Sequence, residues 1–127
     1  MKSFKEKIKK IAKKHYLSLV LMFGSCVTDK THPNSDLDIA VMPEKEIEYS
    51  SILFDLQKIF PEREVDLVFL NRADPLLLKK ILENYKILYG TKQKLALLKI
   101  YAFKKYCDYK KYFDLEKKFV HKFLHSL

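Results

Sequence analysis

The chain has 127 residues, 48% of them hydrophobic, and carries a formal net charge of +9. This length allows one domain with a single core, and the hydrophobic content excludes a disordered chain. The basic balance favours anionic partners such as nucleotides or an acidic protein. Arginine occurs only at Arg63 and Arg72, whereas base-reading proteins rely on arginine forks, so we do not expect direct nucleic-acid binding.

Nothing in the sequence points to a membrane or to an oxidising compartment. No apolar run is long enough to span a bilayer, and the lysine-rich start lacks the apolar core of a signal peptide. Cys26 and Cys107 have no metal-ligand spacing and are interpreted as free thiols. We therefore expect a cytoplasmic protein.

The first predicted element is an amphipathic helix over residues 3–14. Phe4, Ile8, Ile11 and Ala12 recur at helical spacing, and lysines cover the other faces. The basic face is either simply solvated or touches RNA or an acidic partner. The sequence leaves both interpretations open.

Two apolar runs, 17–23 and 39–42, predict strands on either side of a polar loop. The first run is almost wholly apolar, which is typical of a central strand, and it leads into Gly24 and Ser25. Asp36 and Asp38 open the second strand and project from one face, because strand side chains alternate. Neighbouring carboxylates repel each other, and a hard divalent cation such as Mg²⁺ relieves this repulsion.

The remaining elements continue an α/β pattern. A helix is predicted over 47–60, followed by a strand over 64–70 in which Asp66 lies on one face with Val68. Asp66 is either an exposed acid at a strand start or a third carboxylate beside the first two. Asp74 and Pro75 are typical of a helix start, and that helix runs to about residue 84. Residues 85–89 predict a short strand.

From Thr91 onward the chain predicts one or two long helices rich in aromatic residues and lysine. Their apolar positions either pack on the sheet or form a face for a partner. The sequence thus predicts an α/β fold, a small mixed sheet flanked by helices. We expect a domain over 1–90 and a C-terminal helical extension over 91–127 packed on it as a single structural unit.

The spacing Gly-Ser, ten residues, Asp-x-Asp resembles the signature of the DNA-polymerase-β-like nucleotidyltransferases. Within that superfamily the chain is similar to the minimal nucleotidyltransferase (MNT) antitoxins, which are paired with HEPN toxins. The resemblance extends to about Gly90 through three further segments, which are the one around Asp66, the one from Leu70 to Leu77 and the one from Lys86 to Tyr89. The resemblance implies a polymerase-β-like nucleotidyltransferase fold.

The resemblance also implies a site. Asp36, Asp38 and Asp66 would be the catalytic acids and would hold two Mg²⁺ ions, while Gly24, Ser25 and Ser35 would bind the nucleotide. One position departs from the pattern: Thr28 stands where relatives often carry arginine, and Lys30 offers a charge without the bidentate geometry of arginine.

The implied function is transfer of AMP from ATP to a tyrosine of a HEPN RNase toxin, as part of a hetero-oligomer. One alternative, which the Thr28 departure supports, is a catalytically weak antitoxin that acts by binding the toxin. Another is nucleotidylation of a small molecule such as an aminoglycoside. The catalytic motif by itself does not name the acceptor.

Overall fold

The computed structural model describes residues 2–24 and 36–126, in which the helices and strands follow one another in the predicted order. The helices are α1 (Lys2–Lys14), α2 (Tyr49–Ile59), α3 (Pro75–Glu83) and α4 (Lys92–His125). The strands are β1 (Leu17–Phe23), β2 (Leu37–Pro43), β3 (Val65–Phe69) and β4 (Tyr85–Tyr89). Each predicted element is present, with ends that shift by one or two residues.

The strands form one mixed sheet in the order β3-β2-β1-β4. β1 runs antiparallel to β2 and to β4, whereas β2 and β3 run parallel. The parallel pair is possible because α2 carries the chain back between β2 and β3. The apolar β1 lies inside the sheet, as its sequence predicted, while β3 and β4 form the two edges of the sheet.

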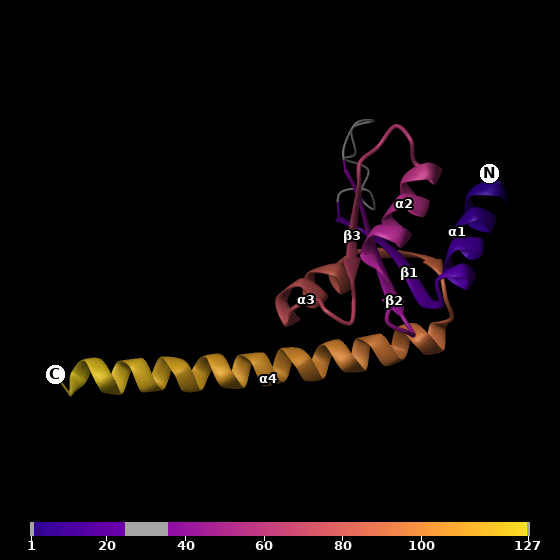
Figure 1. The fold of residues 1–127 in the computed structure, drawn as a ribbon. Coiled ribbons are helices and arrows are strands. Elements are labelled where there is room, and N and C mark those ends of the chain that lie inside the picture. Colours follow the sequence, from indigo (N-terminus) through magenta and orange to yellow (C-terminus); the bar gives the residue numbers. More distant parts are fainter. Residues whose placement is uncertain (1, 25–35, 127) are drawn as a thin grey trace.

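Helices cover both faces of the sheet, α1 and α2 on one side and α3 and the start of α4 on the other (Figure 1). Strand alternation sends Leu37, Ile39 and Val41 of β2 into the core beneath α1 and α2. Ala40, between them, packs in the opposite core beneath α3 and α4. The predicted α/β fold, a small mixed sheet flanked by helices, is confirmed.

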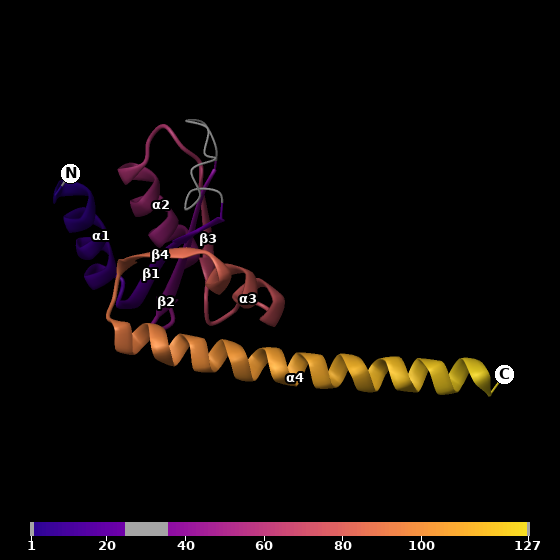
Figure 2. The same ribbon diagram turned by 180° about the vertical axis from the view of Figure 1, so that it is seen from behind.

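α4 is a single helix of 34 residues, and only its first part packs on the sheet. Thr91 caps it by accepting a hydrogen bond from the Lys94 amide at 3.2 Å. Leu95, Leu98 and Ala102 are buried, whereas every residue from 110 to 126 is exposed. Both views show this far half projecting beyond the domain (Figures 1 and 2).

None of the helices in the described part of the chain is long and apolar enough to cross a membrane. The only cysteine that the structure describes, Cys107, is exposed on α4 with a free thiol. The division into a domain over 1–90 and an extension over 91–127 stays a prediction.

Candidate active site

Two of the predicted carboxylates lie side by side on neighbouring strands. Asp38 of β2 is in register with Asp66 of β3 on one side and with Phe23 of β1 on the other. Both acids occupy the face opposite to the core residues of β2 and β3 that pack under α1 and α2. Asp36 is exposed directly before β2. The β2–β3 pairing therefore gathers the three acids at one end of the sheet.

Gly24 lies against Asp38 at the end of β1. A Cβ at position 24 would overlap the carboxylate of Asp38, and the backbone there has φ +77°, a conformation that favours glycine. The resemblance implied that Gly24 binds the nucleotide. The structure gives a further reason for glycine, because a larger residue would displace the central carboxylate.

A cavity of about 560 Å³ opens next to this pair of residues. Its sheet wall consists of Phe23, Gly24 and Asp38, and its opposite wall comes from α3 and the residue that follows it. The residues of this second wall are Leu77, Lys80, Glu83 and Asn84. The volume is in the range of small-molecule sites in proteins.

The sequence did not single out the α3 wall. Leu77, Lys80 and Asn84 recur at spacings of three and four residues, so one helix face carries them. That spacing was available in the sequence, but nothing in it told which face of α3 turns toward Asp38. The packing of the buried Leu78 and Ile81 against the sheet decides this orientation.

The electrostatics of the site centre on Asp38. Burial raises the pKa of the Asp38 carboxyl above its ordinary value of 3.8, and the negative charges of Asp66 and Asp36 raise this pKa further. The positive charge of Lys80 acts in the opposite direction. Asp38 is thus a carboxylate whose ionisation is unfavourable, and Lys80 is the one cation among the described residues that line its cavity.

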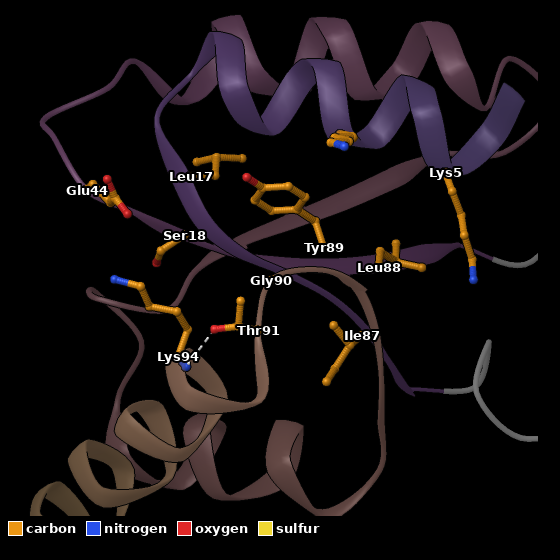
Figure 3. Close-up of a pocket in the computed structure, with 11 residues that line it drawn as sticks. Lys5, Leu17, Ser18, Glu44, Ile87, Leu88, Tyr89, Gly90, Thr91 and Lys94 are labelled. Atoms are coloured by element: carbon orange, nitrogen blue, oxygen red, sulfur yellow. Dashed lines mark hydrogen bonds between the residues drawn. The ribbon is translucent and has the colours of Figure 1, made fainter. Parts of the chain in front are cut away.

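A second cavity, of about 540 Å³, lies beside the edge strand β4 and contains none of these acids (Figure 3). Its floor includes Leu17 and Tyr89, and lysines from α1 and α4 border it. Lysines beside an exposed edge discourage pairing with other strands, which accounts for them without a ligand. The cavity at Asp38 is therefore the candidate active site.

Comparison with protein families identifies the chain. The family described as polymerase beta, nucleotidyltransferase, matches residues 6–94, which include Gly24 and all three acids. The chain belongs to this nucleotidyltransferase family. The four-stranded mixed sheet and four helices of its described residues confirm the polymerase-β-like fold that the resemblance implied.

One curated relative of this nucleotidyltransferase is the protein adenylyltransferase MntA of Shewanella oneidensis. The two are 34% identical over 79 residues, a match that covers 61% of this chain. The matched region spans 57% of the length of that relative.

Solved structures with the same fold come from toxin–antitoxin complexes. One, a toxin–antitoxin crystal structure with AMP-PNP, matches with a TM-score of 0.71 and 26% identity, over 94% of this chain and 98% of that one. Another, the MntA–HepT toxin–antitoxin, matches with a TM-score of 0.65 and 25% identity, over 98% and 99%.

The donor chemistry of this nucleotidyltransferase site fits magnesium, because its candidate ligands are carboxylates, the hard oxygen donors that Mg²⁺ prefers. Within residues 2–24 and 36–126, however, no three His, Cys, Asp or Glu side chains already form a metal-binding cluster. Asp66 and Asp36 are nevertheless close enough to Asp38 for their negative charges to raise its pKa.

Two predicted nucleotide-binding residues, Ser25 and Ser35, lie outside the described residues. The same holds for Cys26, Thr28 and Lys30, so the departure at Thr28 has no structural account. The assignments of Ser25 and Ser35 to the nucleotide, and of Asp36, Asp38 and Asp66 to metal binding, stay predictions.

Proposed function

We propose that this nucleotidyltransferase transfers AMP from ATP to a tyrosine of a cognate HEPN toxin and thereby acts as its antitoxin. The observation that carries the proposal is the register of Asp38 with Asp66, beside Gly24 and facing a cavity. The relatives support this type of reaction and this partner. One relative is a protein adenylyltransferase, and others are toxin–antitoxin complexes, one of them with AMP-PNP.

In the proposed reaction the phenolic oxygen of the acceptor forms a bond to the α-phosphorus of ATP. The bond from that phosphorus to the bridging oxygen breaks, and pyrophosphate leaves with the electron pair. Asp66, which is exposed at the edge strand β3, accepts the phenolic proton. Gly24 and Ser25 bind the β- and γ-phosphates, with Ser35 as a further contact to the nucleotide.

Asp36, Asp38 and Asp66 are the residues that would hold two Mg²⁺ ions. Bound there, the ions would supply Lewis-acid stabilisation of the triphosphate charge. What the chain itself contributes is position, because the register of β2 with β3 fixes Asp38 next to Asp66. A metal also offsets the cost of ionising Asp38 among like charges.

The far half of α4 is the proposed contact surface for the toxin. Its exposed apolar side chains are Tyr112, Phe113, Leu115, Phe119, Val120, Phe123 and Leu124. Exposed apolar residues gathered on a projecting helix are typical of a surface that a partner covers. The proposed complex is a hetero-oligomer, and a cytoplasmic location for it stays a prediction.

The test combines α-labelled ATP, Mg²⁺, the purified protein and its candidate HEPN toxin. We expect label on the toxin with the wild type, no label with Asp38→Asn or with a chelator, and a tyrosine as the modified residue by mass spectrometry. A stable complex without label would replace this proposal by an antitoxin that acts through binding alone. Label on small molecules but not on the toxin would favour the small-molecule transferase.

A further inference from the structure

Lys80 brings a positive charge to the candidate active site from the α3 side. Among the described residues that line the cavity, it is the only lysine or arginine. Gly24 and Asp38 form the facing wall, so the cavity has one carboxylate on the sheet side, and the Lys80 ammonium together with the Glu83 carboxylate on the helix side.

The packing of α3 fixes the direction in which Lys80 projects. Asp74 caps the helix by accepting a hydrogen bond from the Leu77 amide at 2.8 Å. Leu78 and Ile81 are both 0% exposed in the core beneath the sheet, so the helix cannot rotate without exposing them. The position of Lys80 beside the cavity is therefore set by the core and does not depend on a loop.

The neighbouring Lys79 lies against α4 instead of lining the cavity. Its ammonium lies 4.8 Å from the centre of the Tyr106 ring on α4, so it faces the other helix. Two consecutive lysines on α3 thus point to different surroundings, and only Lys80 lines the cavity. This difference provides a control of equal charge within the same helix.

Lys80 is close enough to Asp38 to lower the pKa of that carboxyl, against the effect of burial. In the part of the chain that the structure describes, ion pairs are seen at Asp55 and none joins Lys80 to Asp38. The Lys80 ammonium, with three donors, is therefore in a position to bind an anion that enters the cavity.

We propose that Lys80 binds the triphosphate of ATP and neutralises charge on the pyrophosphate as it leaves. This inference rests on the proposed function, in which the phosphates are the anionic part of the reaction and the acceptor phenol is neutral. As the bond from the α-phosphorus to the bridging oxygen breaks, negative charge accumulates on the leaving group. An ammonium in the facing wall stabilises that charge, as in other phosphoryl transfers.

The test measures binding of ATP and of AMP, each with Mg²⁺ and without acceptor, to the wild type and to three full-length variants. We expect Lys80→Met to weaken ATP binding by about tenfold to a hundredfold, the range for a hydrogen bond to a charged group. AMP lacks the β- and γ-phosphates, so its affinity should stay within about twofold. Lys79→Met should match the wild type, and Lys80→Arg should restore most of the affinity for ATP.

The outcomes separate this inference from the proposed function. Equal ATP affinity in the wild type and Lys80→Met would overturn the role of Lys80 and leave the transferase intact. Equal loss of ATP and AMP binding, or no rescue by Lys80→Arg, would show a role in the shape of the site and would also overturn it. A wild type that binds no ATP would overturn both.

Discussion

At the scale of single residues, Asp38 is the carboxyl of the site whose ionisation is least favourable in the folded protein. This carboxylate is partly buried, has two acids nearby and lies against Gly24, where any side chain would overlap it. Proteins retain such destabilising groups where function requires them. The free-energy cost of ionising Asp38 is expected to fall when a cation binds beside it. Asp38, which is central to the proposed reaction, is therefore expected to destabilise the metal-free protein.

We predict that Asp38→Asn abolishes transfer and yet stabilises the metal-free protein. Folding raises the pKa of Asp38, so the ionised carboxylate destabilises the folded state. This destabilisation appears as the pH rises above the unfolded pKa and is complete above the folded pKa. Asparagine keeps the shape and removes the charge. With a chelator at neutral pH, the melting temperature should rise by about 1–3 °C.

The matched control for this prediction is Asp114→Asn, which removes one negative charge from an exposed position on α4. Its melting temperature should stay at the wild-type value. The gain from Asp38→Asn should also disappear in acid, below the ordinary carboxyl pKa, where the wild-type Asp38 is protonated in both states. A lower melting temperature for Asp38→Asn at neutral pH would contradict this account.

At the scale of elements, a polar contact fastens α1 to α2. The Nε2 atom of His15, a residue only 7% exposed, lies 2.6 Å from the carboxylate of Asp55, and the Lys14 ammonium lies 3.0 Å from the same oxygen. The hydrogen bond from His15, followed by that from Lys14, lowers the pKa of Asp55 below its ordinary value of 3.8. The apolar spacing of α1 predicted a basic helix with one buried face and gave no sign of this contact.

We predict that Asp55→Ala lowers the free energy of unfolding by about 1–3 kcal/mol, because it leaves the buried His15 without this partner. The contribution of Asp55 is fully present above its unfolded pKa and is lost as the pH falls through its lowered folded pKa. The free energy of unfolding, measured with urea at neutral and at acidic pH for the wild type and Asp55→Ala, tests both predictions. Glu62→Ala, at an exposed acid in the turn after α2, is the control and should change little.

At the scale of the whole molecule, α4 serves two purposes along its length. Leu95, Leu98 and Ala102 complete the core beneath α3, whereas residues 110–126 are exposed beyond the domain (Figure 2). A helix of this length with an uncovered far half gains little stability from tertiary packing there. The far half is therefore expected to matter for the complex more than for the fold.

We predict that a chain ending after Tyr109 stays folded and binds ATP but no longer binds the toxin. A chain ending after Gly90 should unfold, because it lacks the three buried side chains of α4. Melting temperature, ATP binding and co-purification with the toxin distinguish the two truncations. Retention of the toxin by the chain ending after Tyr109 would place the contact surface elsewhere.

The helices, the strands and the family were predicted correctly from the amino-acid sequence, whereas the roles of the proposed site residues stay predictions. Apolar runs of strand length indicated β1 and β2, and the spacing from Gly24 to Asp36 and Asp38 resembled that of a nucleotidyltransferase. Asp74 and Pro75 marked the start of α3 correctly. Such features are visible in sequence because they depend on residues near one another along the chain.

Contacts between residues far apart in the chain could be learned only from the tertiary fold. The fold places Asp66 in register with Asp38, turns Lys80 into the cavity while Lys79 faces α4, and joins His15 to Asp55. It also divides α4 into a packed and an exposed half, although apolar residues recur along the whole helix. Helical spacing predicts which residues share a face, but only packing against the sheet determines what that face meets.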